Sequence, residues 1–173
     1  MRKATKGLVL AGAATAMLAG TVAPATAATA GAAKATSPYA NVRLEKVWGK
    51  IGMCLSMDGS TKNNAVLKLR GCSKNDASQR WTLSGSKGVY TIKNRKSGKC
   101  LGVSSTKSGT QVTQRSCNAK SSTQQWTLGG SKIISKWAGK VITANNDASG
   151  TKIVISQYDK STAGRKKQEW GLS

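Results

Sequence analysis

Short runs of alternating or β-branched residues, separated by turn-forming residues, dominate the chain after residue 40. Examples are residues 89–92, 100–103, 112–115 and 126–128. Clusters of Gly, Ser, Asn and Asp separate the runs, as is typical of strands joined by tight turns. No segment shows a convincing helical period. The pattern predicts short β-strands throughout and no helix.

One five-residue word occurs three times. Residues 79–83, 124–128 and 168–172 read QRWTL, QQWTL and QEWGL, so the tryptophans are 45 and 44 residues apart. Repetition at such a period indicates repeated structural units. Aligning the words gives repeats of about 41–84, 85–129 and 130–173, each with four predicted strands and twelve in all. Three such units in one closed all-β domain predict a β-trefoil, a barrel with a threefold axis and no exposed sheet edges.

The first 27 residues have the features of a secretory signal peptide. Basic residues at positions 2, 3 and 6 precede an apolar run over 8–23, and Ala25-Thr26-Ala27 supplies a cleavage motif. A membrane anchor is the alternative, but the run of mostly small residues is shorter than the roughly 20 residues that span a bilayer. We expect cleavage near Ala27, with Ala30 as a second position, a short linker over 28–40 and a secreted protein.

Secretion favours disulfides for the four cysteines, which allow three pairings. Pairing within each unit keeps the first two units equivalent and closes loops of 18 and 17 residues, which favours Cys54–Cys72 and Cys100–Cys117. In the third unit we expect apolar packing of the residues at the same positions, Val141 and Tyr158. A zinc site is the competing interpretation. Because the chain has no CxxC spacing and no His, we expect no metal and no cofactor.

The chain is strongly basic. Its net charge is +22, and residues 28–173 retain 25 basic and 6 acidic residues, a net charge of +19. Such an excess favours polyanionic partners: teichoic acids, acidic polysaccharides, anionic lipid surfaces or nucleic acid. An ordinary solvated surface is the alternative. We expect a glycan or an acidic polymer of the cell envelope as ligand, with a protein partner as a further alternative. We expect no nucleic acid binding and a monomer.

Catalytic constellations are missing from the sequence. Without His there is no Ser-His-Asp or Cys-His arrangement, and the four cysteines are assigned to disulfides. The acidic residues are scattered among predicted turns without an evident carboxylate pair for glycoside hydrolysis: Glu45, Asp58, Asp76, Asp147, Asp159 and Glu169. We therefore expect a binding protein and no enzyme.

The repeated words resemble those of the ricin-type β-trefoil lectin domain. Each unit of about 45 residues ends in a Gln-x-Trp word, and the second unit has Gly-Lys-Cys-Leu and then a second Cys nine residues ahead of the Trp. The similarity covers roughly residues 41–173. In that family the Trp packs in the shared core, and the Gln amide bonds to backbone near the sugar-binding turn. The resemblance implies these structural roles for Gln79, Trp81, Gln124, Trp126, Gln168 and Trp170.

The residues that bind neutral sugars in that family are replaced in every unit. The family uses an Asp after the Cys-Leu pair, a ring two residues before the second Cys, and an Asn before the Gln. These positions hold Ser56, Gly102 and Thr143; Arg70, Arg115 and Ser156; and Ser78, Thr123 and Lys167. Asp58 lies two residues after the position of the family's Asp and is interpreted as a turn residue. The resemblance thus implies a lectin-like module without a galactose-type site.

Arginine at two of the ring positions suggests sites converted to anionic ligands, because guanidinium matches carboxylate and phosphate in a bidentate fork. Surface arginines without a special role are the alternative. Trp48 and Trp137 lie outside the repeated words. Trp137 is placed to offer a stacking ring, although burial under a neighbouring loop is the favoured interpretation. The candidate ligand-binding residues are Arg70, Arg115, Asn118, Gln124 and Trp137.

The sequence therefore predicts a secreted, non-catalytic carbohydrate-binding module for a cell-wall or acidic glycan. The alternative is a cationic trefoil interaction protein that binds envelope polyanions or protein partners and has lost sugar recognition.

Overall fold

The structure is a computed structural model that describes Ser37 and residues 39–173. The predicted signal peptide over 1–27 and most of the predicted linker over 28–40 lie outside the described residues. Within them the chain forms thirteen strands, two 3₁₀ helices (η) and one α-helix. In order these are β1 (Tyr39–Val42), β2 (Leu44–Lys46), β3 (Met53–Ser56), β4 (Lys68–Gly71), η1 (Ala77–Gln79), β5 (Trp81–Ser86), β6 (Val89–Asn94), β7 (Cys100–Gly102), β8 (Thr113–Arg115), η2 (Ser122–Gln124), β9 (Trp126–Gly129), β10 (Lys132–Ser135), β11 (Lys140–Ala144), β12 (Ile153–Ser156), α1 (Thr162–Gln168) and β13 (Trp170–Leu172).

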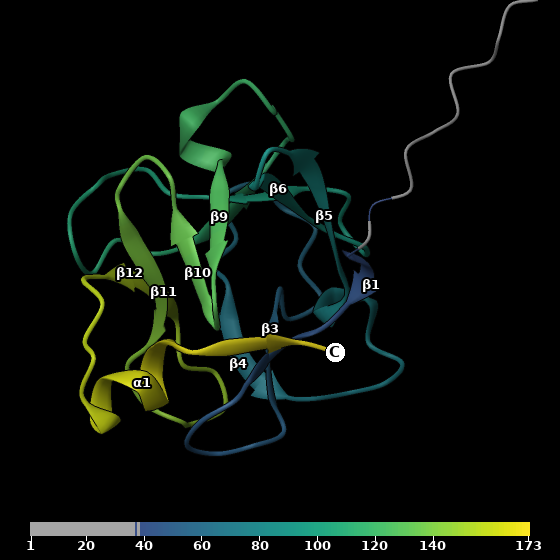
Figure 1. Cartoon of the computed structure of the whole chain (residues 1–173). Helices are drawn as coiled ribbons and strands as arrows, with labels where there is room; N and C mark the ends of the chain where they lie inside the picture. The colour runs from purple at the N-terminus through teal and green to yellow at the C-terminus, as the bar shows by residue number, and fades with distance from the viewer. Residues whose placement is uncertain (1–36, 38) are drawn as a thin grey trace, which may run out of the picture. The chain divides into compact units, whose positions relative to one another are not determined.

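The strand pairs are antiparallel, and consecutive strands such as β5–β6 and β9–β10 form hairpins, as short runs separated by turn residues predict (Figure 1). A nine-stranded sheet runs β1-β5-β6-β9-β10-β11-β12, with β7 paired to β6 and β8 to β7, and a four-stranded sheet runs β13-β2-β3-β4. A two-residue turn joins β5 to β6. Both of its residues have positive φ, 52° at Lys87 and 75° at Gly88, and this geometry matches the twist of the two strands.

A ring of backbone hydrogen bonds joins the three units. Leu67 N donates to Val112 O, Val112 N donates to Ile153 O, and Ile153 N donates to Leu67 O, each at 2.9 Å. The three residues hold the same position in their units, and all are fully buried. A closed ring with one member from each unit is the signature of a threefold axis. The fold is the predicted β-trefoil.

The tryptophans of the repeated words fill the core. Trp81 and Trp126 are 0% exposed and Trp170 is 2% exposed. Each indole Nε1 donates to the carbonyl of the residue that follows the first Cys position of its own unit, so no indole nitrogen is left unpaired by burial. These acceptors are Leu55 O at 3.3 Å, Leu101 O at 3.1 Å and Ile142 O at 3.1 Å.

The glutamines of the same words bridge two backbone groups of the preceding turn. In the second unit Gln124 Nε2 donates to Ser116 O at 3.0 Å, and Asn118 N donates to Gln124 Oε1 at 2.8 Å. Gln79 makes the same pair of bonds with Gly71 and Ser73, and Gln168 makes it with Gln157 and Asp159. All three glutamines are buried. An amide supplies one donor and one acceptor from a single side chain, which is why Gln recurs before each buried Trp.

The third unit contains a helix that the sequence pattern did not predict. In the third unit the Trp follows the ring residue by 17 positions, from Ile153 to Trp170, whereas in the first unit it follows by 14, from Leu67 to Trp81. The three additional residues turn the 3₁₀ helix of the other units into α1, which lies against β11 (Figure 1). Ser161 caps its start by accepting from Gly164 N. Seven residues are too few to show a helical period, so the prediction of no helix was wrong here.

The first two units each contain one disulfide. Cys54 is bonded to Cys72 and Cys100 to Cys117, the within-unit pairing, and no cysteine in the described part of the chain is free. In the third unit Val141 is buried. Tyr158 is only half-buried, and its hydroxyl donates to Glu169 Oε1 at 2.7 Å.

Candidate functional site

The surface beside each Gln bridge differs among the three units. In the first unit Arg70 is held by Asp58. Arg70 Nε donates to Asp58 Oδ1 at 2.8 Å, and Nη2 donates to Oδ2 at 2.6 Å. Lys68 Nζ donates to Oδ2 at 2.9 Å, and Ser149 Oγ accepts from Arg70 Nη1 at 3.2 Å. Asp58 has the positive φ of the turn residue that we predicted, 54°, but it is also an ion-pair partner.

This bidentate pair removes Arg70 from our candidate ligand set. A carboxylate within the molecule already occupies the fork of the guanidinium, and an external anion would have to displace it. The partner, twelve positions earlier in the chain, comes from the β3–β4 connection, and its ion pair with Arg70 argues against an anion site there.

The Asp58 ion pair makes stability depend on pH. Hydrogen bonds from Arg70, and then from Lys68, lower the pKa of the Asp58 carboxyl from 3.8 to about 2. The pair therefore stabilises the fold above pH 4, and this contribution is lost as the pH falls through the folded-state pKa near 2. Because the Asp58 side chain is 35% exposed, solvent screening leaves on the order of 1 kcal/mol. The free energy of unfolding of Asp58→Asn should lie below that of the unchanged protein at pH 6, and urea titrations should show this gap closing between pH 4 and pH 2. A gap of constant size would contradict the ion pair.

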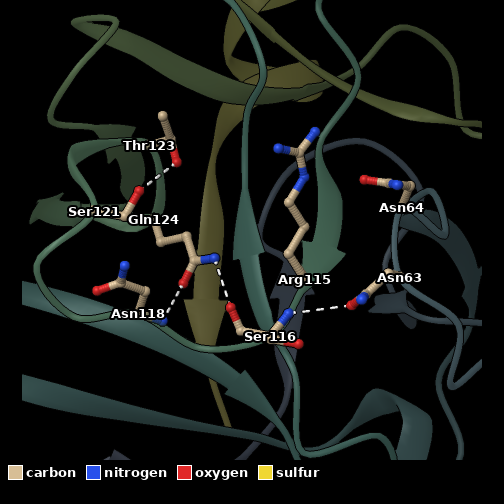
Figure 2. A pocket seen from close by; sticks show the side chains of 8 residues that line it. All are labelled: Asn63, Asn64, Arg115, Ser116, Asn118, Ser121, Thr123 and Gln124. Carbon is tan, nitrogen blue, oxygen red and sulfur yellow. Dashed lines mark hydrogen bonds between the residues drawn. The ribbon is translucent and has the colours of Figure 1, made fainter.

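The second unit forms a pocket at the same position. Its volume is about 490 Å³, and polar residues line it: Asn63, Asn64, Arg115, Ser116, Asn118, Ser121, Thr123 and Gln124 (Figure 2). Strand β8 supplies Arg115, the turn after β8 supplies Asn118, and η2 supplies Gln124. Three of the five predicted ligand-binding residues thus line one pocket.

Arg115 has no anionic partner, unlike Arg70. It forms no ion pair with any carboxylate of the described residues, and its buried Nε has no hydrogen-bond acceptor. Figure 2 shows its side chain extending between the Gln-x-Trp turn on one side and the Asn63-Asn64 pair on the other. A buried donor without an acceptor costs free energy, more so when the group is charged. The pocket therefore offers a guanidinium whose binding capacity the fold itself does not use.

The rest of the pocket is held in place by internal hydrogen bonds. Asn63 Oδ1 accepts from Ser116 N at 3.2 Å, which ties the loop of the first unit to the second. Asn118 Oδ1 accepts from Lys120 N at 3.0 Å, and this fixes the side chain while its amide nitrogen remains a donor. The hydroxyls of Ser121 and Thr123 share a bond of 2.8 Å. Amides and hydroxyls arranged in this way suit the hydroxyl groups of a polar ligand.

Gly102 stands at the position where the family has its sugar-binding Asp. A Cβ atom at Gly102 would lie 3.1 Å from both Gln124 Cγ and Thr123 O. A side chain here would press on the Gln bridge and on η2. The second unit therefore has no carboxylate at the family's Asp position, and the surroundings of Gly102 leave little room for one.

The two tryptophans outside the repeated words are exposed. Trp137 is 41% exposed in the β10–β11 turn, and Trp48 is 40% exposed with its ring centre 4.4 Å from the Arg165 guanidinium carbon. The expected burial of Trp137 was wrong, since Lys136 and Gly139 on either side of it are themselves exposed. Trp137 does not line the pocket of Arg115.

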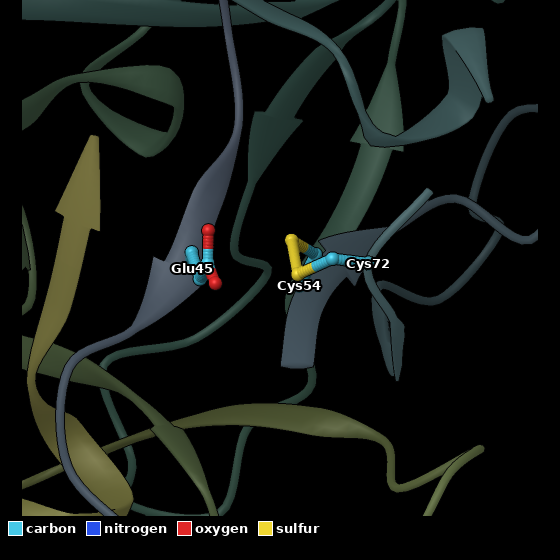
Figure 3. Close-up of side chains that lie close together, drawn as sticks. All are labelled: Glu45, Cys54 and Cys72. Atoms are coloured by element: carbon cyan, nitrogen blue, oxygen red, sulfur yellow. A yellow bond between two sulfur atoms is a disulfide. The ribbon is translucent and has the colours of Figure 1, made fainter. Parts of the chain in front are cut away.

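One group of potential metal ligands occurs in the described part of the chain. A Glu45 carboxylate oxygen and the sulfurs of Cys54 and Cys72 lie within 4.8 Å of one another (Figure 3). Both sulfurs are in the disulfide, so neither is a thiolate, the form that binds metal. A single carboxylate that already accepts a hydrogen bond from Ser173 Oγ does not make a metal site. The residues do not fit a metal ion.

The fold is a β-trefoil domain, and its second unit carries an open polar pocket. The sequence model of the family described as the ricin-type beta-trefoil lectin domain matches residues 40–170, and the chain belongs to this family. No curated protein sequence matches the chain. No helix in residues 39–173 is long and apolar enough to cross a membrane.

Solved structures with similar folds include designed and natural trefoils. The designed threefold-symmetric protein ThreeFoil is 26% identical, with 76% of this chain and 96% of that chain covered and a TM-score of 0.66. The Polyporus squamosus lectin is 18% identical, with 78% and 48% covered and a TM-score of 0.65. The C-half of the earthworm R-type lectin is 12% identical, with 77% and 97% covered and a TM-score of 0.61. These structures share the trefoil fold, and membership of the lectin family supports a carbohydrate-binding domain.

Proposed function

We propose that this protein is a secreted, non-catalytic module that binds an acidic glycan through the pocket of Arg115. The observation that carries the proposal is the Arg115 guanidinium, which forms no ion pair and no hydrogen bond within the described residues and lies in a pocket otherwise lined by amides and hydroxyls. A carboxylate, phosphate or sulfate on a sugar can pair with the terminal nitrogens of this guanidinium, and the amides and hydroxyls bind the sugar's own hydroxyl groups.

The secreted, non-catalytic part of the proposal has separate support. The signal-peptide pattern of residues 1–27 and the two disulfides suit an oxidising compartment. Four of the six carboxylates are engaged in ion pairs with Arg or Lys: Glu45, Asp58, Asp147 and Glu169. A hydrolytic site needs a pair of carboxylates facing one substrate, and carboxylates held by cations are poorly suited to that role.

Replacing Arg115 by Ala tests the proposal. Affinity for a carboxylated polysaccharide such as polygalacturonate, measured by isothermal titration calorimetry, should fall about tenfold or more, because one charge-assisted contact contributes about 1.5–3 kcal/mol. Arg70→Ala is the matched control. It removes the same charge from the same position of the first unit, where Asp58 already occupies the guanidinium, and should change affinity less than twofold.

The two variants also separate pocket binding from diffuse charge attraction, the mechanism of the alternative interaction protein. Equal losses in Arg70→Ala and Arg115→Ala would mean that only net charge matters and that the pocket is not a site. Melting temperatures of both variants should be measured first, so that loss of binding is not loss of fold.

A further inference from the structure

A second group of cations lies where the first unit meets the second, outside the pocket of Arg115. Lys74, Arg80 and Arg95, with Asn75 and Ala77, line a hollow of about 280 Å³. Within residues 39–173 none of these three cations forms an ion pair with a carboxylate. Asp76 is adjacent in sequence, but its Oδ1 accepts from Ser78 N at 2.8 Å and from Ser78 Oγ at 2.6 Å.

Two of these cations, Arg80 and Arg95, donate hydrogen bonds to the same residue, Asn41. Arg80 Nη1 donates to Asn41 O at 3.4 Å, and Arg95 Nη1 donates to Asn41 Oδ1 at 2.9 Å. Arg80 Nη2 also donates to Lys74 O at 2.9 Å. Asn41 belongs to β1, so this arrangement comes from three separate parts of the chain. Two guanidinium groups fixed on one residue repel each other, and an anion between them would relieve that repulsion.

The second unit shows that the scaffold does not need the charge of Arg80. The same backbone hydrogen bond occurs in both units: Arg95 N donates to Arg80 O at 2.8 Å, and Lys136 N donates to Gln125 O at 2.9 Å. Gln125 is therefore the equivalent of Arg80, and Lys136 is the equivalent of Arg95. Gln125 Nε2 donates to Ala119 O at 3.0 Å, which is the bond that Arg80 makes to Lys74 O. A neutral amide therefore satisfies the same backbone carbonyl, so this bond does not require the positive charge of Arg80.

The third unit shows that an oxyanion fits at this place in the fold. The residue equivalent to Arg80 is Glu169, whose backbone O accepts from Val47 N at 3.4 Å. The Glu169 carboxylate is 6% exposed and accepts from Arg165 Nε at 2.9 Å and from the Tyr158 hydroxyl at 2.7 Å. The Arg165 hydrogen bond holds the pKa of Glu169 below its usual range. In the third unit the chain thus supplies its own anion at this place, whereas the hollow of Lys74, Arg80 and Arg95 is lined by cations and by no carboxylate.

We infer that the hollow of Lys74, Arg80 and Arg95 is a second binding site, which takes a phosphate or sulfate group carried on a polymeric ligand. Two guanidinium forks and one ammonium offer more donors and charge than a single carboxylate uses, and they suit a tetrahedral oxyanion. The site shares no residue with the pocket of Arg115 and recognises a charged substituent, not a sugar ring. It therefore goes beyond the proposed function and stands without it.

Arg80→Gln is the informative variant, since it installs the residue of the second unit and keeps a donor for Lys74 O. Lys136→Gln is the matched control because it removes one charge at the exposed position equivalent to Arg95. With inorganic pyrophosphate as the probe, amide chemical shifts in a ¹H–¹⁵N spectrum should move at residues 74–80 and 95. The dissociation constant derived from these shifts should rise at least fivefold in Arg80→Gln and stay unchanged in Lys136→Gln.

Polymers separate the sources of the anion. Polyphosphate, dextran sulfate and polygalacturonate carry phosphate, sulfate and carboxylate, and Arg80→Gln should weaken binding of the first, the second or both. Sensitivity to polygalacturonate alone would overturn the assignment of the ligand class. Shift changes spread over lysines of all three units, or equal losses in Arg80→Gln and Lys136→Gln, would overturn the site itself. Failure of Arg115→Ala to affect polygalacturonate binding would count only against the proposed function.

Discussion

Replacing Trp126 by Ala should lower the free energy of unfolding by about 3–5 kcal/mol, the usual effect of deleting a buried aromatic side chain. Trp126 is fully buried in the common core, and its Nε1 donates to Leu101 O at 3.1 Å. Removing the indole leaves a cavity and also an unpaired buried carbonyl. Both effects act in the same direction, and urea denaturation followed by circular dichroism measures their sum.

Trp137→Ala is the control for this prediction. It deletes the same side chain from a turn where the ring is 41% exposed, so stability should change by about 0.5 kcal/mol or less. If both variants lose the same free energy, the tryptophans of the repeated words do not form the core. A loss in Trp126→Ala well below 2 kcal/mol would lead to the same conclusion.

The features that the sequence predicts well are those that each unit repeats. The strand runs, the buried Trp and the Gln bridge recur because each unit must meet its neighbours in the same way around the ring of Leu67, Val112 and Ile153. Three examples of one word distinguish a shared structural role from chance. The helix α1 was not predicted because it does not repeat. Only the third unit has the three additional residues, so no second unit shows what structure they form.

The candidate site was predictable only in part. Arg115 and Gln124 follow from positions in the repeat, whereas Asn63 and Asn64 reach the pocket from the preceding unit. Their approach depends on contacts between units, such as the bond of 2.8 Å from Asn64 N to Gln114 O, and no sequence pattern within one unit records these contacts.

Arg70 and Arg115 illustrate the same limit. They occupy the same position of the repeat, and sequence reasoning assigns them the same role. Asp58 decides the difference, because it lies where its carboxylate reaches Arg70 Nε and Nη2. The second unit has Ser104 in the corresponding turn, two residues after Gly102, and Ser104 brings no charge. One side chain in a turn thus separates a closed ion pair from an open site.

Binding to an acidic polymer should weaken steeply with salt. If the protein neutralises about four charges of the polymer, raising salt from 50 to 200 mM should reduce affinity on the order of 100-fold, because bound counterions are released on association. With a net charge of +19 over residues 28–173, such release is expected for any polyanion. The slope of log affinity against log salt, measured by calorimetry at four salt concentrations, gives the number of charges involved.

The variants turn this slope into a test of where the polymer binds. Arg115→Ala should reduce the magnitude of the slope by about 1, the value for one charge contact, and Arg80→Gln should do the same for polyphosphate or sulfated polymers. Arg70→Ala should leave the slope unchanged. Galactose at millimolar concentration should not compete, since Ser56, Gly102 and Thr143 provide no carboxylate for its hydroxyls. Binding that ignores salt and is reversed by galactose would defeat the polyanion interpretation. It would redirect attention to Trp48 and Trp137, whose rings are 40% and 41% exposed and on which a neutral sugar can stack.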